Sequence, residues 1–436
     1  MQKYMSSTID DLCHQKMKTI AGAFENLAKR FRYIDNREGA LNASQEAVQI
    51  YQQLAADRPA AFNSDLVHSL NNLSIHLSEL GQKEEALNAV KKAVQIYQQL
   101  AADRPVVLDS ELARFLNILS NRLSDLGQKE EALNAIQKSV QIYQQLATDR
   151  PEAFNSDLAG SLNNLSNCLS DLGEKEEALN AIKKAVQIYQ QLATDKPAAF
   201  NSNFARSLHS LSNCLSALGQ KEEALYTAKK AVEIREQLAT DRPAAFNPDL
   251  ACSLNNLSNR LSNLGQKEEA LDAIKRAVQI RQQLATNRPA AFNSDFARSL
   301  TNLSIHLSEL GQKEEALNSV KQAVQIHQQL ATDRPAVFNS EFARSLNIFS
   351  NRLSDLGEKE EALNAIQKSV QICQQLAASR PAAYNSDLAH SLIGLSNCLS
   401  KLGQKEEALK AIEKAVQICQ QLAADRPAAF NSDLAF

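Results

Sequence analysis

The segment Leu264-Gly265-Gln266-Lys267-Glu268-Glu269-Ala270-Leu271 decides the fold, because it recurs along the chain at an unvarying spacing of 46 residues. A proline keeps the same period. The glycines are Gly81, Gly127, Gly173, Gly219, Gly265, Gly311, Gly357 and Gly403, and the prolines are Pro59, Pro105, Pro151, Pro197, Pro243, Pro289, Pro335, Pro381 and Pro427. Self-similarity at a period of about 20 to 50 residues indicates a solenoid, in which each repeat buries its apolar face against its neighbours.

The residues before this segment predict an amphipathic helix. Its apolar residues are Leu250, Leu254, Leu257, Leu261 and Leu264. Alternating spacings of four and three place them on one helix face. Ser258 lies beside that face, where a neighbouring helix can approach closely, and Gly265 ends the helix because it tolerates positive φ. The linker 243–248 begins and ends with proline, and we expect it not to be helical throughout.

The residues after the segment predict a second helix. Glu268 and Glu269 fall in its first turn, where negative charge complements the helix dipole. A single apolar stripe follows, made of Ala270, Leu271, Ile274, Ala277, Val278 and Leu284. The short connection through Gly265 makes the two helices antiparallel neighbours. Each repeat is therefore predicted to be a helix pair that needs its neighbours for stability.

The composition excludes several classes of protein. At 436 residues the unbroken period favours one elongated body, and with 44% hydrophobic and 5% aromatic residues the core must be built from Leu, Ile, Val and Ala. The 47 basic and 50 acidic residues leave no excess of positive charge for nucleic acid or an anionic membrane. No run of about 18 apolar residues could span a bilayer. Seven cysteines without C-x-x-C spacing, and an N-terminus without a signal sequence, favour the cytoplasm.

The pattern L-x-x-L-S-x-x-L-x-x-L-G-x-x-E-E-A-L-x-x-I-x-x-A-V closely resembles the tetratricopeptide repeat (TPR). The stretches 277–284 and 253–257 are most similar to the kinesin-light-chain subtype, although the 46-residue repeat is longer. The resemblance covers roughly residues 20–436. It implies an all-α, right-handed α-solenoid of antiparallel helix pairs with nine repeats, whose first helices line a concave groove that binds a peptide or protein.

The ends of the chain depart from the pattern. Residues 1–34 are predicted to be a helical segment that includes the first helix of a degenerate repeat, in which Asp35 replaces the turn glycine. The tandem array then occupies residues 35–430, and residues 431–436 open a truncated tenth repeat. No polar capping helix covers the apolar stripe of the ninth repeat. We therefore expect either that the sequence is a fragment of a longer array or that this C-terminal repeat associates with another copy of the chain or with another protein.

The polar stripe opposite the leucines of each first helix is the predicted binding face. Asparagine amides there could hold the backbone of an extended peptide, and arginines could pair with carboxylates or phosphates. In the alternative interpretation this is a solvated face whose asparagines bond to one another. The predicted partner-binding residues are Arg114, Asn121, Asn164, Asn167, Arg206, Asn213, Asn256, Asn259, Arg298, Asn302, Arg344, Asn351 and Asn397.

Two further positions vary from repeat to repeat. The first is chemically diverse and is therefore predicted to be exposed: His76, Arg122, Cys168, Cys214, Arg260, His306, Arg352 and Cys398. The second lies on the second helices: Tyr51, Tyr97, Tyr143, Tyr189, Arg235, Arg281, His327, Cys373 and Cys419. We expect the second set to pack between repeats, and the alternative is an aromatic patch for an anchoring side chain of the partner.

The sequence predicts no enzyme, cofactor or metal site. The histidines are scattered, and phosphate-binding and nucleophile motifs are absent. The repeated Lys-Glu-Glu runs lie at helix starts and match the dipole. The chain is therefore interpreted as a non-enzymatic protein-interaction scaffold. The alternative is the ligand-sensing segment of a larger signalling NTPase, of the kind in which similar arrays occur.

Overall fold

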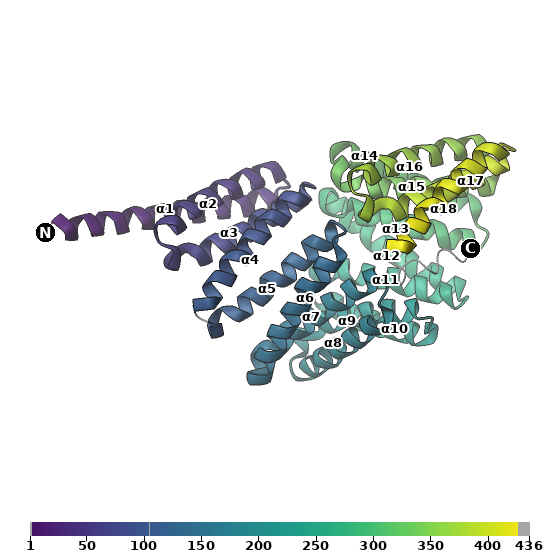
Figure 1. Ribbon diagram of the computed structural model, residues 1–436. Coiled ribbons are helices and arrows are strands. Elements are labelled where there is room, and N and C mark those ends of the chain that lie inside the picture. Colours follow the sequence, from purple (N-terminus) through teal and green to yellow (C-terminus); the bar gives the residue numbers. More distant parts are fainter. Residues whose placement is uncertain (1, 104, 426–436) are drawn as a thin grey trace. The chain divides into compact units, whose positions relative to one another are not determined.

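The computed structural model describes residues 2–103 and 105–425, which form eighteen α-helices and no strand (Figure 1). The first helices of the nine repeats are α1 (Gln2–Tyr33), α3 (Pro59–Glu79), α5 (Pro105–Asp125), α7 (Pro151–Leu172), α9 (Pro197–Ala217), α11 (Pro243–Asn263), α13 (Pro289–Glu309), α15 (Pro335–Leu356) and α17 (Pro381–Lys401). The second helices are α2 (Arg37–Asp57), α4 (Lys83–Asp103), α6 (Lys129–Asp149), α8 (Lys175–Asp195), α10 (Lys221–Asp241), α12 (Lys267–Asn287), α14 (Lys313–Asp333), α16 (Lys359–Ser379) and α18 (Lys405–Asp425). The predicted solenoid of helix pairs is confirmed.

The chain divides into two compact parts, residues 1–146 and 147–436. In the first part each helix from α1 to α5 packs on the next one, and α6 is joined to α5 by a 2.7 Å hydrogen bond from the Asn117 amide to Ser139. In the second part consecutive helices pack together from α7 to α18. The division falls inside α6, where the sequence period shows no break.

Glycine ends the first helices as predicted. Gly173 caps α7 with φ of 86°, in the left-handed region. The amide of Glu174 then bonds back to the Leu169 carbonyl at 3.0 Å, which satisfies one of the last carbonyls of the helix. In the first repeat Asp35 adopts the same kind of conformation, with φ of 59°. An aspartate is among the few residues that tolerate this region.

The linker prediction is wrong, because the prolines lie inside the first helices. Pro243 occupies the first turn of α11, where its missing N–H would have no intrahelical partner. Pro248 also lies within α11, so residues 243–248 are helical throughout. The helix loses the one hydrogen bond that residue 248 would donate to the Ala244 carbonyl. Packing against α10 and α12 holds the helix together despite this loss.

A buried serine joins the two helices of a repeat. Ser166 on α7 is 0% exposed, and its hydroxyl donates a 2.8 Å hydrogen bond to the Ala178 carbonyl on α8. The same bond links Ser212 to Ala224 and Ser350 to Ala362. A larger side chain could not fit where the two backbones come this close. The expectation that a neighbouring helix approaches closely at this serine position is confirmed.

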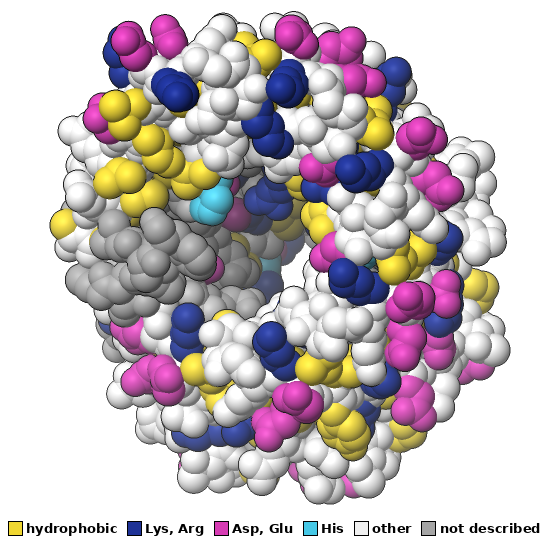
Figure 2. All heavy atoms as spheres, turned by 90° about the vertical axis from the view of Figure 1, so that its right-hand side faces the viewer, with side chains coloured by type: hydrophobic (Ala, Val, Ile, Leu, Met, Phe, Trp, Pro, Cys, Tyr) yellow, Lys and Arg dark blue, Asp and Glu magenta, His cyan; other side chains and the backbone are white. Residues whose placement is uncertain are grey.

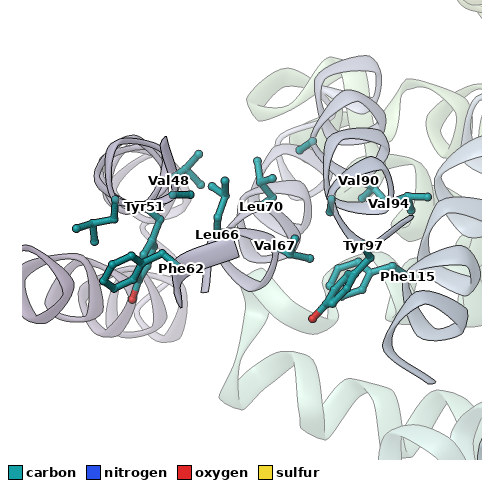
Figure 3. Packing of buried hydrophobic residues seen from close by; sticks show 14 of the residues in the cluster. Val48, Tyr51, Phe62, Leu66, Val67, Leu70, Val90, Val94, Tyr97 and Phe115 are labelled. Carbon is teal, nitrogen blue, oxygen red and sulfur yellow. The ribbon is translucent and has the colours of Figure 1, made fainter. Parts of the chain in front are cut away.

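The core of the first part contains more aromatic surface than the composition led us to expect. Tyr97 of α4 and Phe115 of α5 are almost fully buried, and their ring centroids lie 5.2 Å apart (Figure 3). Val67 of α3 and Val90 of α4 complete the surrounding apolar cluster (Figure 3). Leucine, valine and alanine still dominate elsewhere.

No described helix combines the length and the hydrophobicity needed to cross a membrane. Residues 431–436, which were predicted to open a tenth repeat, lie outside the described residues. On α18 the stripe named for self-association is partly exposed, since Leu409 is 56% and Val416 44% accessible while Leu422 is buried.

Candidate functional site

We call the predicted partner-binding residues and their equivalents in other repeats the first-helix stripe. Its arginine position lies at the surface: Arg206, Arg298 and Arg344 are exposed and Arg114 is half-buried. Arg298 forms a 3.0 Å ion pair with Asp295 one turn earlier. Arg114 contacts Glu111 at 2.6 Å and, one repeat back, His68 at 3.4 Å. These contacts leave the guanidinium groups at the surface, where a partner can reach them.

The first asparagine position of the stripe is exposed in every repeat that has asparagine there. These residues are Asn121, Asn167, Asn213, Asn259, Asn351 and Asn397. The second position is more enclosed: Asn164 and Asn302 are half-buried, and Asn256 is only 7% exposed.

Asn256 shows how the stripe is held together between repeats. Its amide donates to the Asn213 side-chain oxygen at 2.6 Å, and its own oxygen accepts from Ser212 and from Arg260, both at 3.2 Å. The ring of His209 lies 3.3 Å from the same amide. Asn256 is therefore saturated by internal contacts, as the alternative interpretation of the asparagines envisaged for this face.

The prediction that the diverse position at His76 is exposed is wrong. Cys168, Cys214, His306 and Cys398 are buried there, and the arginines are half-buried. The position faces the first helix of the preceding repeat. His306 accordingly contacts Ser258 at 3.2 Å, and Cys214 contacts Ser166 at 3.4 Å. The position tolerates this diversity because side chains such as His306 and Cys214 find polar partners on the edge of the neighbouring helix.

The second-helix position packs between repeats, as predicted. We call the space it occupies the interhelix slot: within each part of the chain it lies between the first helix of the same repeat and the first helix of the next. The occupants from Tyr51 to Cys373 are buried along both parts of the chain. Tyr143 and Tyr189 donate to the backbone carbonyls of Ser110 and Ser156, at 3.0 and 2.9 Å.

Other slots hold a cation or a histidine. Arg235 and Arg281 donate to the carbonyls of Asp249 and Asp295 on the following first helix, each at 2.7 Å. His327 contacts Ser345 at 2.7 Å. Burial and the nearby charges of Arg298 and Arg344 lower the pKa of His327 to about 4, so the ring is neutral at neutral pH.

The slot floored by Cys373 contains a pocket of about 360 Å³. Ser340, Arg344 and Ile348 of α15 line one side, and Asp387, His390 and Ser391 of α17 line the other. Cys373 is 2% exposed, and its thiol lies 3.4 Å from the Ser391 hydroxyl and also bonds the Ser369 side chain. Of the residues named from the sequence as partner-binding, Arg344 is the one that this pocket contains.

The sequence pattern also singled out Cys373, at the variable second-helix position, but it did not predict a pocket there. A signal was present, because the slot residue changes from tyrosine through arginine and histidine to cysteine along the chain. A position that loses most of its volume inside an otherwise regular array predicts an unfilled space.

The charges on the surface are mixed. In the face drawn in Figure 2, basic and acidic side chains are interspersed, and no large area of one sign appears among the described residues. Within residues 2–103 and 105–425 no group of three or more His, Cys, Asp or Glu is placed to hold a metal ion. The chemistry offered is therefore that of individual hydrogen-bonding and cationic side chains.

Models of the tetratricopeptide repeat match most of the chain. The matched residues are 66–103, 112–149, 157–237, 250–285, 296–332, 342–378 and 389–422. No curated protein matches the sequence.

Several solved structures share the fold. The apo form of the quorum sensor NprR from B. thuringiensis is 15% identical, with a TM-score of 0.55, over 93% of this chain and 99% of that one. A Rap protein complexed with Competence and Sporulation Factor is 13% identical, with a TM-score of 0.54, over 95% of this chain and 100% of that one. A putative kinesin light chain of Podosopora anserina is 22% identical over 51% of this chain and 97% of that one, but its TM-score of 0.39 does not bear on the predicted subtype.

Proposed function

As the chain belongs to the tetratricopeptide repeat family, we propose that it is a non-enzymatic scaffold that binds a peptide or protein along the first-helix stripe. The observation that carries this proposal is the repeated exposure of arginine and asparagine at fixed positions of successive first helices. Asn167, Asn259 and Asn351, for example, each present an amide to solvent. An amide offers two donors and an acceptor, which suits the backbone of an extended segment.

The exposed arginines favour a partner with acidic or phosphorylated side chains. A guanidinium pairs with a carboxylate or phosphate through two parallel hydrogen bonds. Two of the structurally similar proteins are a quorum sensor and a Rap protein complexed with Competence and Sporulation Factor, which supports a peptide-binding role for this fold. The proposal places the scaffold in the cytoplasm, because seven cysteines without framework spacing suit a reducing compartment.

The test begins with peptides selected on the whole purified chain from a displayed random library. Fluorescence polarisation then compares wild type with Arg206→Glu/Arg298→Glu, which reverses two charges on the stripe. We expect the selected acidic peptides to bind this variant more than about tenfold more weakly, a loss of about 1.4 kcal/mol or more.

The matched control is Lys275→Glu/Lys321→Glu, which reverses two exposed charges on second helices. Binding to the control should stay within about twofold, because Coulomb effects at a distance are screened by salt. Equal losses in both variants would argue against the stripe. A selection that returns no binder would argue against a peptide scaffold.

A further inference from the structure

The interhelix slots form an internal series in which one place in the repeat is filled by different side chains. In repeats two to four the occupant is tyrosine. The hydroxyl of Tyr97 bonds Ser64, and those of Tyr143 and Tyr189 bond the carbonyls of Ser110 and Ser156. These three serines occupy the same position of the 46-residue repeat. A phenol in this place is therefore a recurrent feature of the array.

Ser340 is the equivalent serine in the eighth repeat, and it lines the pocket above Cys373. The cysteine side chain ends at Ser391 on α17 and leaves the part of the slot next to Ser340 unfilled. The pocket of about 360 Å³ thus has the surroundings that a tyrosine hydroxyl has in repeats two to four. It is also at the lower end of the size range of small-molecule sites, roughly 300 to 1,000 Å³.

The charges around the pocket select among the side chains that fill the other slots. Arg235 and Arg281 both lie beside Cys252, the neutral residue that interrupts the arginine position of the first-helix stripe. The Cys373 slot is flanked by Arg344 and His390, and Asp387 also lines it. A second cation beside Arg344 would be repelled by its guanidinium, and Asp387 offsets only part of this repulsion.

A neutral aromatic side chain meets no such repulsion. Tyr97 provides the precedent, because its slot is flanked by the corresponding pair, His68 and Arg114. Its ring is 1% exposed there. An aromatic face beside a guanidinium gains cation–π attraction, and Ile348 adds an apolar wall to the pocket.

We propose that the pocket between α15 and α17 is a specificity site for a tyrosine side chain of the bound peptide. Its ring lies in the space next to Ser340 that Cys373 leaves unfilled, with its Cβ toward solvent and its hydroxyl within reach of the polar groups that line the pocket. The partner thereby supplies the side chain that the eighth repeat lacks. This proposal rests on the proposed scaffold function, since it names one side chain that the stripe would anchor.

The first probe is p-cresol, which reproduces the tyrosine side chain and needs no peptide binding along the stripe. Ligand-detected NMR with the whole chain should show binding with a Kd on the order of 1 mM. Cys373→Tyr fills the slot from within and should weaken this binding at least tenfold, whereas Cys373→Ala should retain it. Cys214→Ala is the control, because it removes a buried thiol outside any slot.

The location can be checked without a variant. In a crystal soaked with 4-bromophenol the anomalous signal of bromine should lie in the Cys373 pocket, and bromine elsewhere alone would overturn the proposal. Unchanged p-cresol binding by a folded Cys373→Tyr protein would overturn it too. Toluene binding as tightly as p-cresol would contradict the role of the hydroxyl.

The second arm separates this site from the scaffold function. Among peptides selected on the wild-type chain, replacing tyrosine by alanine should weaken binding at least tenfold to wild type and by less than about twofold to Cys373→Tyr. Peptides that depend on Arg206 and Arg298 but not on any tyrosine would leave the scaffold standing and remove the pocket from it.

Discussion

Arg235 of α10 donates a 2.6 Å hydrogen bond to the hydroxyl of Ser253 on α11, the first helix of the next repeat. The guanidinium is 4% exposed, and it also bonds the Asp249 carbonyl. The positive charge of Arg235 is thus buried between two repeats. This burial lowers the pKa of the guanidinium group. The stability of this junction depends on the following repeat, which supplies both hydrogen-bond acceptors, the Asp249 carbonyl and the Ser253 hydroxyl.

Arg235 can be exchanged for the residue that fills the same slot elsewhere. Arg235→Tyr should change the stability by no more than about 1 kcal/mol, because replacing a buried charge by a well-packed side chain is often close to neutral. Arg235→Ala should cost about 2 to 4 kcal/mol, since it leaves a cavity. Urea unfolding followed by circular dichroism compares the two variants. Equal destabilisation by tyrosine and alanine would show that the slots are not interchangeable.

Ser166 is fully buried between the two helices of its repeat. Ser166→Leu should destabilise the protein by about 1 to 3 kcal/mol or more, because overpacking forces the backbones apart. Asn167→Leu, on the exposed neighbouring residue, should stay within about 0.5 kcal/mol. Thermal melting of both variants decides the matter. A neutral Ser166→Leu would mean that the repeat can open without penalty.

Gly265 has φ of 76° and open space around the position of an added Cβ. Gly265→Ala should therefore cost about 1 kcal/mol through backbone strain alone. Gly22 lies inside α1 and also has room for a Cβ, so Gly22→Ala should stabilise that helix by about 0.5 to 1 kcal/mol. Chemical denaturation should give the two substitutions opposite signs.

His327 predicts a pH dependence of stability. Its folded pKa of about 4 lies below the ordinary value of 6.5, so between these values the unfolded chain binds a proton that the folded chain does not. Stability then falls as the pH falls from 6.5 to 4, by about 3 kcal/mol from this residue. His327→Tyr should remove that part of the loss, as measured by denaturation at pH 7 and pH 4.5.

Cys373→Tyr is the control for this measurement, because it fills the equivalent slot of the next repeat and leaves His327 in place. It should leave the pH dependence of unfolding as in the wild type. If His327→Tyr also leaves the pH dependence of unfolding unchanged, the pKa of His327 is not lowered by its burial as proposed.

The features that repeat could be predicted from the sequence. The apolar spacing around Leu254 and Leu261 gave the helix pairs, and Gly265 gave the turn. The prediction of a non-helical linker at Pro248 was wrong because the penalty for proline in a helix is local, whereas the packing that offsets this penalty comes from α10 and α12. The prediction that His306 is exposed was wrong for a similar reason. The apolar stripe of a helix shows where its partner in the repeat lies, but not which edge faces the preceding repeat.

The pocket above Cys373 escaped prediction because it arises from a difference between repeats rather than from the repeat itself. A consensus sequence of the repeat predicts that every slot is filled. Only a comparison of side-chain volumes at this position shows that the small Cys373 leaves its slot partly empty. The Asn256 network depends in the same way on Asn213 and Ser212 in the preceding repeat. Such contacts follow from the packing angle between repeats, which the 46-residue pattern leaves open.

The stacking of each helix on the helices before and after it also bears on how the chain acquires its structure. Side-chain bonds between neighbouring repeats, such as Ser258 with His306 and Ser350 with Cys398, join residues 48 positions apart. Loop closure over such short distances costs little chain entropy, and folds rich in local contacts form in microseconds to milliseconds. A ribosome that releases the chain one repeat at a time would thus expose each new helix pair to a finished surface on which it can dock.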